Sequence, residues 1–306
     1  MQHYVLDSSH AGAGDTVTAA WLAAGADLTD HTRIWLHPGR HERLARSLGA
    51  RIASRPRPDG GRCVHLGLPG RVYPHQIGLG GGVRPITETW QDVMPFRVRA
   101  ARPAVVLEDD ARHWAMDYRD RRPDAVQGRP MALLFPRCCY GPRNWPQAHW
   151  IRLAWVLREM GYDAVALDSR PDTLLDFPSR VYGQPWPRIM ALMQLADCVV
   201  ANESGPAHVA GTLEAPTFVI LGPTRFEANM AYLGGSVHGI HVSPDRVACV
   251  GCHFSRHRGF SGACSHGCEA LHALTVAEVA QEVRKWRLRD YCPGLGATPL
   301  PISMTW

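Results

Sequence analysis

Short apolar segments alternate with helical patterns along the first part of the chain. Residues 4–6, 33–36 and 63–66 form apolar segments, while residues 15–24 and 41–48 space their apolar side chains as helices do. Short apolar runs separated by helices are typical of parallel strands that crossover helices cover on both faces. This region therefore predicts a parallel α/β sheet.

The alternation restarts after residue 130. Strands are predicted at residues 131–135, 163–167, 198–201 and 217–221, and helices from Pro146, from Pro187, from Asn202 and over residues 275–286. In the helix from Pro146, apolar residues recur at i, i+3, i+4 and i+7, at Trp150, Leu153, Ala154 and Leu157. The second part of the chain predicts a second parallel sheet.

The segments between these two regions are less regular. Residues 105–107 are predicted as one more strand. Residues 67–82 are irregular and rich in glycine, and they receive no assignment. Residues 117–130 are polar and rich in turn formers, as expected for a linker.

Two parallel sheets joined by a linker predict two Rossmann-like domains that face a cleft. The length of 306 residues suits two domains, which we place at residues 1–125 and 126–286. A tail at residues 287–306 is expected to pack back toward the first domain. In an open parallel sheet, ligands bind beyond the carboxyl ends of the strands, so the strand-to-helix loops are the candidate site.

Composition and charge exclude fewer classes of protein than the residues of the strand-to-helix loops do. Hydrophobic residues make up 45% of the chain and charged residues 20%, as in ordinary globular proteins. The sequence contains no apolar run long enough to span a membrane and no leader pattern, so we expect a cytoplasmic protein. The net charge of +5, carried mainly by arginine, suits a polyanionic partner but does not require one.

The first loop, residues 8–15, contains Gly12 and Gly14 but not the third glycine of a dinucleotide fingerprint. The following strand also ends without the acidic residue that a nicotinamide enzyme uses. Both departures argue against a dehydrogenase. Asp15 has two interpretations: a carboxylate that stabilises the first turn of its helix, or a catalytic group.

Two later loops carry groups that suit a phosphate ligand. Residues 136–146 contain Arg137 and Arg143 between glycine and proline, which suits a diphosphate site, although a solvated surface loop is the alternative. Residues 202–208 open a helix whose N–H groups can bind phosphate. In that helix Glu203 could accept hydrogen bonds from ribose hydroxyls, and His208 is either structural or functional. A fourth loop, residues 222–224, could flank the same ligand.

These loops together resemble glycosyltransferase family 9, the bacterial heptosyltransferases. The matching elements are Gly14-Asp15, then Arg143-Asn144-Trp145-Pro146, then Glu203-Ser204-Gly205-Pro206-Ala207-His208-Val209-Ala210, and finally Gly222-Pro223-Thr224. The resemblance is dense over residues 131–286 and rests mainly on Gly14-Asp15 before that. Glu203 stands where the family usually has aspartate. The first domain also looks shorter than in enzymes that act on lipid A precursors.

The resemblance implies a GT-B fold and an inverting transfer from a nucleotide-diphosphate sugar to an acceptor hydroxyl. It implies that Asp15 is the general base and that Arg143 stabilises the departing diphosphate, with no catalytic metal. The expected donor-side residues are Arg137, Glu203, Ser204, Gly205, Pro206, Ala207, His208 and Thr224. The expected acceptor-side residues are His10, Gly12 and Gly14.

The acceptor stays open at this point. A lipopolysaccharide core sugar, a protein serine or threonine, and a hydroxymethylated DNA base all fit the sequence. A nucleotide-sugar epimerase of the same fold and a non-catalytic nucleotide-sugar-binding protein are the alternative functions. The sequence does not specify the nucleotide base, the sugar or the oligomeric state.

Four of the nine cysteines lie close together, at Cys249, Cys252, Cys264 and Cys268. Two close pairs separated by a short loop suit a tetrahedral site with four thiolate ligands. Because all four ligands come from the protein, such a zinc or iron site would be structural. The alternative is a set of reduced thiols in a surface loop.

Overall fold

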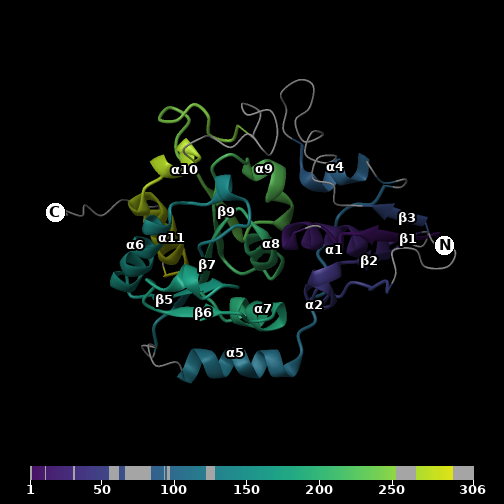
Figure 1. Cartoon of the computed structure of the whole chain (residues 1–306), viewed down its shortest axis with the longest axis horizontal. Coiled ribbons are helices and arrows are strands. Elements are labelled where there is room, and N and C mark those ends of the chain that lie inside the picture. The colour runs from purple at the N-terminus through teal and green to yellow at the C-terminus, as the bar shows by residue number, and fades with distance from the viewer. Residues whose placement is uncertain are drawn as a thin grey trace.

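The computed structural model describes residues 2–10, 12–29, 32–54, 62–65, 84–92, 94, 97–121, 128–252 and 267–291. Within these residues the chain forms two parallel sheets, which lie on opposite sides of the molecule in Figure 1. The glycine-rich residues 67–82, Cys264 and residues 292–306 of the predicted tail lie outside the described part. The predicted α/β class with two parallel sheets is confirmed.

The N-terminal sheet has the strand order β2-β1-β3, with parallel pairing throughout its described part. Its elements are β1 (Gln2–Asp7), α1 (Ala13–Asp27), β2 (Thr32–His37), α2 (Glu42–Ser47), β3 (Arg62–His65) and α4 (Ile86–Asp92). Small residues in α1 let other backbone segments approach the helix closely. A Cβ atom on Gly25, for example, would overlap the carbonyl oxygen of Arg99.

The C-terminal sheet has the order β6-β5-β4-β7-β8-β9, again parallel. Its strands are β4 (Met131–Phe135), β5 (Asp163–Asp168), β6 (Arg180–Tyr182), β7 (Cys198–Asn202), β8 (Thr217–Ile220) and β9 (Val237–Ile240). Its helices are α6 (Gln147–Glu159), α7 (Trp186–Gln194), α8 (Gly205–Thr212), α9 (Phe226–Asn229), α10 (Glu269–Ala273) and α11 (Val276–Tyr291). Every residue of β4, β7 and β8 is buried, which explains why these strands read as continuous apolar runs.

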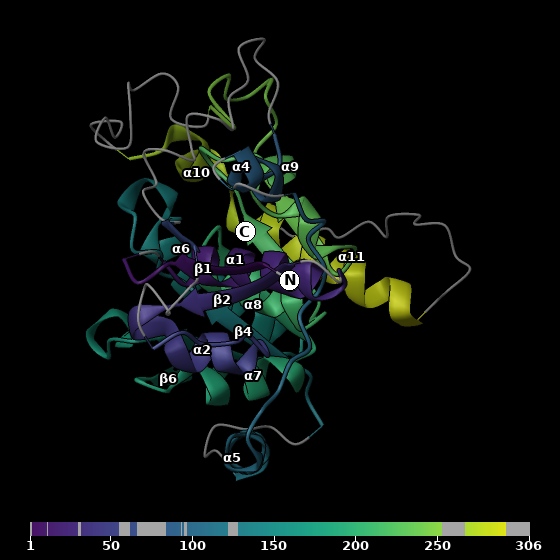
Figure 2. The same cartoon turned by 90° about the vertical axis from the view of Figure 1, so that its right-hand side faces the viewer.

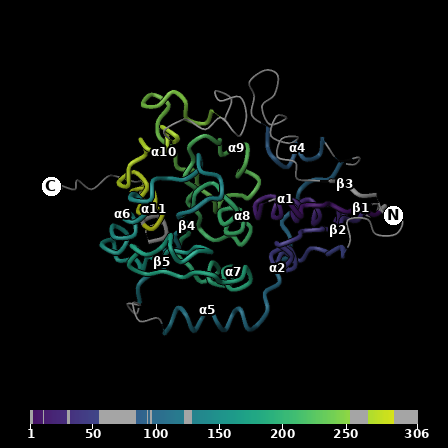
Figure 3. The backbone as a smooth tube through the Cα atoms, viewed as in Figure 1, coloured from purple at the N-terminus to yellow at the C-terminus, as the bar shows by residue number. Residues whose placement is uncertain are grey.

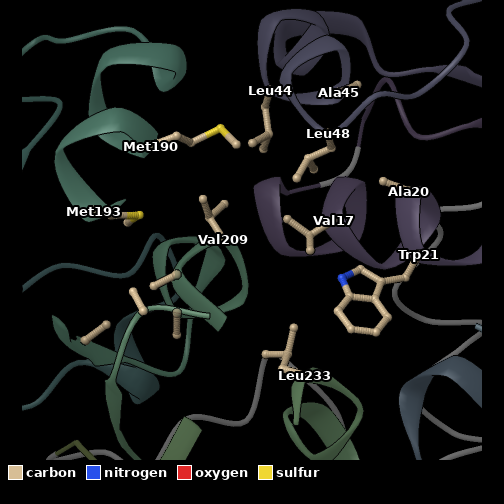
Figure 4. Packing of buried hydrophobic residues seen from close by; sticks show 14 of the residues in the cluster. Val17, Ala20, Trp21, Leu44, Ala45, Leu48, Met190, Met193, Val209 and Leu233 are labelled. Atoms are coloured by element: carbon tan, nitrogen blue, oxygen red, sulfur yellow. The ribbon is translucent and has the colours of Figure 1, made fainter. Parts of the chain in front are cut away.

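The hydrophobic core consists of two clusters, and one of them contains residues of both halves. One cluster covers a single face of the C-terminal sheet and includes Trp150 and Leu157 of α6. The other cluster joins the opposite face of that sheet to the N-terminal half. In Figure 4, Val17 of α1 and Leu44 of α2 face Met190 of α7 and Val209 of α8. The halves are therefore packed against each other through apolar side chains.

The segment that connects the halves differs from the prediction. Residues 105–107 form no strand. This segment is extended, and the Val106 N–H donates a hydrogen bond to the carbonyl oxygen of Ser47 at 2.8 Å. The predicted linker begins inside a helix, because α5 (Asp109–Arg121) continues through residues 117–121.

Helix α5 lies apart from both sheets, as the tube in Figure 3 shows, and Figure 2 shows it end-on. It packs beside α7, where the Arg188 guanidinium lies 5.5 Å from the centre of the Trp114 ring. No helix in the described residues is long and apolar enough to cross a bilayer.

Candidate functional site

The first turns of α1 and α8 lie side by side where the two halves meet. A Cβ atom on Gly205 would lie 2.7 Å from the Cβ atom of Ala13, and at the far end Trp21 Nε1 donates to Thr212 Oγ1 at 2.9 Å. The helices therefore run in the same direction, and their N-terminal ends meet. Because helix N-termini carry free N–H groups and partial positive charge, this end attracts anions.

Close approach of the two helices depends on Gly205. We expect Gly205→Ala to lower the melting temperature, because the new methyl group pushes α1 away from α8. Gly235→Ala is the matched control, since a Cβ atom there meets nothing within 4 Å. Thermal unfolding of the two variants and the wild-type protein measures the effect. Equal behaviour of the two variants would show that the helix contact can relax without consequence.

Asp15 is the third residue of α1, and its Oδ2 accepts a hydrogen bond from the Gly12 N–H at 2.9 Å. The carboxylate thus stabilises the first turn of its own helix, as one of the two interpretations expected. Burial raises the pKa of Asp15 above its ordinary value, and the charge of Glu203 adds to this, while the Gly12 N–H, His208 and Arg143 lower the pKa in part. The structure therefore brings Asp15 together with the residues predicted on the C-terminal side.

Glu203 is the centre of this group and is only 2% exposed. Its Oε2 accepts a hydrogen bond from Arg143 Nη1 at 2.8 Å, and its Oε1 lies 3.7 Å from His208 Nε2. Burial raises the pKa of Glu203, but Arg143 and His208 together lower it well below its ordinary range. Glu203 therefore favours its ionised form and holds the Arg143 guanidinium beside the α8 N-terminus.

Two asparagines hold the loops that carry Arg143 and Glu203. Asn202 Oδ1 accepts from the Trp145 N–H at 3.0 Å, and Asn202 Nδ2 donates to the Pro136 carbonyl at 2.8 Å. Asn144 Nδ2 donates to the Cys138 carbonyl at 3.0 Å, which closes the loop on itself. Asn144 is a site residue that the sequence pattern does not predict, and its position directly after Arg143 is the available signal.

Tyr232, in the short helix Ala231–Leu233, also belongs to the site and was not predicted. Its hydroxyl lies 2.8 Å from His208 Nδ1 and 3.3 Å from Thr18 Oγ1 of α1. The Tyr232 ring packs edge-on against Trp21, with ring centres 5.1 Å apart. Burial raises the pKa of Tyr232, so its hydroxyl keeps its hydrogen. Tyr232 thus connects the helix of Asp15 with the helix of His208.

Arg137 lies at the end of β4 and points to a different partner. It donates two hydrogen bonds to Asp168, from Nε at 2.6 Å and from Nη2 at 2.8 Å, and a third to Ser169 Oγ. The hydrogen bond to Asp168 raises the pKa of Arg137. Arg137 is therefore engaged in a bidentate ion pair, whereas Arg143 reaches Glu203.

The remaining predicted residues divide between buried and exposed positions. Ser204 directly precedes α8, and its carbonyl accepts a hydrogen bond from the Ala207 N–H at 3.0 Å, while Pro206 lies in the first turn of the helix. Thr224 is 3% exposed and its Oγ1 has no hydrogen-bond partner in the described residues, so a ligand could satisfy it. His10 is exposed, while Gly14 contacts the ring of His208.

Three of the four clustered cysteines lie in the described part of the chain. Cys249 and Cys252 are partly exposed and Cys268 is buried. Burial raises the pKa of the Cys268 thiol to about 11, and the charges of Cys252 and Cys249 add to the rise. Without Cys264, the described residues contain no group of three or more histidine, cysteine or acidic side chains placed to hold a metal ion.

Solved structures define the class of this fold. The Escherichia coli ADP-heptose lipopolysaccharide heptosyltransferase II superimposes with a TM-score of 0.60 at 15% identity, over 95% of this chain and 100% of that one. The iron-containing dodecameric glycosyltransferase TibC from enterotoxigenic Escherichia coli gives a TM-score of 0.66 at 14% identity, over 96% and 80% of the two chains. The fold is therefore that of the GT-B glycosyltransferases.

Sequence comparison shows similarity to one family over part of the chain. The profile of glycosyltransferase family 9 (heptosyltransferase) matches residues 186–240, from α7 to β9, which include Glu203 and His208. Lipopolysaccharide heptosyltransferase 2 of Escherichia coli is 31% identical over 111 residues, which are 31% of this chain and 32% of that protein. The chain spans less than half the length of the curated relatives that it matches. The resemblance to family 9 predicted from the sequence is confirmed.

Proposed function

We propose that the protein transfers a sugar from a nucleotide-diphosphate sugar to an acceptor hydroxyl with inversion at the anomeric carbon. One observation carries the proposal: the adjoining N-termini of α1 and α8 bring Asp15 of one half together with Arg143, Glu203 and His208 of the other. This arrangement supports the assignment of Asp15 as a proton acceptor and of Arg143 as part of a diphosphate site.

Each group has a distinct task in the proposed reaction. Asp15 removes the proton of the acceptor hydroxyl as its oxygen attacks the anomeric carbon, and the bond to the diphosphate breaks on the opposite face. Arg143 and the N–H groups of α8 stabilise the charge on the departing diphosphate. This step uses only charges that the chain itself supplies. Arg137, held by Asp168, would bind the donor at the edge of the site.

The acceptor we favour is a lipopolysaccharide core sugar, since the relative with 31% identity is a lipopolysaccharide heptosyltransferase. The fold neighbours include an ADP-heptose enzyme, so ADP-heptose is the first donor to test. A protein hydroxyl and a hydroxymethylated DNA base are the other acceptors, and DNA binding that falls steeply with salt would favour the last. The domain boundaries and the cytoplasmic location remain predictions from the sequence.

A panel of nucleotide sugars tests the proposal directly. A donor that binds only the native state raises the melting temperature, and the same donor should then be consumed only when an acceptor is present. Conversion of the donor without an acceptor would indicate an epimerase. Binding without any turnover would indicate a nucleotide-sugar-binding protein. Binding of no nucleotide sugar would contradict the proposal as a whole.

We also propose a structural zinc or iron site formed by Cys249, Cys252 and Cys268 with Cys264. We expect protein purified without chelators to contain close to one metal ion per chain, and Cys252→Ser to lose most of it and melt at a lower temperature. Cys139→Ser is the control, since that exposed thiol belongs to another loop. The metal content of the wild-type protein, Cys252→Ser and Cys139→Ser tests this site. Wild-type protein that contains no metal would refute it.

A further inference from the structure

The loop between β4 and α6 contains two adjacent cysteines with different exposure to solvent. Cys138 is buried, whereas Cys139 is exposed. Asn144 holds Cys138 in place, because Asn144 Oδ1 accepts from the Cys138 N–H at 2.5 Å and Asn144 Nδ2 donates to the Cys138 carbonyl at 3.0 Å. The Tyr140 N–H donates to Cys138 Sγ at 3.4 Å. The accessible thiol of Cys139 therefore has a fixed and shielded thiol as its neighbour.

Positive charges from both halves of the molecule surround the side chain of Cys139. A hydrogen bond joins its thiol to that of Cys138, and the pKa of Cys139 responds to this bond and to the charges of Arg143 and Arg40. The pKa of Arg137 responds in turn to Cys139. Arg137 and Arg143 belong to the same loop as Cys139, while Arg40 lies in the turn after β2 of the N-terminal half. These guanidinium groups favour a negative charge on the exposed sulfur.

The two neighbouring thiols differ in acidity. The hydrogen bond with Cys138 lowers the pKa of Cys139 more than burial raises it, and Arg143 and Arg40 add to the lowering. The same hydrogen bond, together with burial, raises the pKa of Cys138. Because the thiolate is the nucleophile in thiol chemistry, Cys139 is the reactive member of the pair and Cys138 is the hydrogen-bond donor.

We propose that Cys139 is a modification site that takes up a small thiol by exchange with a low-molecular-weight disulfide. The Cys139 thiolate attacks one sulfur of the disulfide, a new S–S bond forms, and the other half of the disulfide leaves as a thiolate. The attached group then occupies the loop that contains Arg137 and Arg143. Resting on the proposed function, it would compete with the donor diphosphate for these arginines, and an added reducing thiol would restore the site.

The reactivity of Cys139 is measured by alkylation with iodoacetamide at neutral pH, and tandem mass spectrometry distinguishes Cys139 from Cys138. In the native protein we expect Cys139 to react about 10-fold faster than the same residue in protein unfolded by urea, because an ordinary cysteine is only a few per cent thiolate at this pH. Folding alone would shield a thiol and slow its alkylation. Equal or slower alkylation of Cys139 in the native protein would overturn the proposal.

Cys138 and Arg40 offer variants that test the surroundings of Cys139. Cys138→Ala removes the hydrogen-bond donor, so Cys139 should react several-fold more slowly, whereas Cys138→Ser keeps a donor and should react as the wild type does. Arg40→Gln removes a nearby charge and should also slow the reaction. Arg46→Gln is its control, since Arg46 forms an exposed ion pair with Glu42. Circular dichroism checks that each variant is folded, and unchanged rates in both Cys138→Ala and Arg40→Gln would contradict the proposal.

The effect of the modification on the site is tested with glutathione disulfide. Treated wild-type protein should carry glutathione at Cys139 and lose the rise in melting temperature that ADP or UDP produces, and dithiothreitol should restore this rise. Cys139→Ser should keep the nucleotide effect after the same treatment. If untreated protein binds no nucleotide, the proposed function fails, while alkylation still decides whether Cys139 is the reactive site. If glutathione is attached at Cys139 and nucleotide binding is unchanged, the competition for the arginines is refuted.

Discussion

Replacing Asp15 by asparagine should lower turnover by about 10²- to 10⁴-fold, the usual loss for a missing acid–base group, while nucleotide affinity stays nearly unchanged. Asparagine keeps an oxygen that can accept the Gly12 N–H, so the first turn of α1 should stay intact. Asp15→Ala should show the same loss of turnover together with lower stability, because the helix loses its cap. Steady-state kinetics and nucleotide titration separate the two effects.

The pH profile provides an independent check on Asp15. Burial raises the pKa of this carboxyl, so its charged form should be lost at a higher pH than for an ordinary aspartate. A general base works only when it is deprotonated, so kcat/KM should fall as the pH drops through this raised pKa. Asp109→Asn is the control, since Asp109 is exposed in the first turn of α5. Wild-type rates in Asp15→Asn would remove Asp15 from the mechanism.

Replacing Arg143 should affect stability, binding and turnover together. Arg143→Met leaves the Glu203 carboxylate buried without its principal cation, which typically costs about 3–5 kcal/mol of the free energy of unfolding. The diphosphate of the proposed donor would also lose a cationic partner, so nucleotide affinity and kcat should both fall. Chemical denaturation and calorimetric titration measure the two losses.

A double variant separates the structural role of Arg143 from its functional role. Arg143→Met combined with Glu203→Gln removes the unpaired charge, so much of the lost stability should return while nucleotide affinity stays low. Arg137→Gln is the comparison, because the Arg137 side chain is 32% exposed and its loss should destabilise the protein less. Unchanged nucleotide affinity in Arg143→Met would contradict its assignment to the donor site.

The four central strands of the C-terminal sheet could be predicted from the sequence, whereas its edge strands β6 and β9 and the connection between the halves could not. Strands β4, β7 and β8 are buried throughout, so their apolar runs stand out from the polar loops. Helix α5 was overlooked because charged residues dominate it. Its buried Ala111 and Ala115 do recur at i and i+4, which was the available signal.

In the site, residues that lie in polar loops could be predicted, whereas a residue recognised only by contacts distant in sequence could not. Asp15, Arg143 and Glu203 each belong to a loop whose composition indicated a role. Tyr232 carries no local motif, and its partner Thr18 lies 214 positions away in the chain. Such a contact depends on how the two halves pack, which hydrophobic periodicity does not encode.

The apolar packing that joins α1 and α2 to α7 and α8 has a consequence for folding. Val17 and Leu44 belong to the cluster that joins the two halves, so removal of the C-terminal half would expose part of their apolar surface to water. Neither half should then persist as an independent domain, and calorimetry should record a single cooperative melting event for the whole molecule. For the proposed transferase, wide separation of the halves would expose this apolar seam to water, so we expect substrate exchange to proceed by small sliding movements.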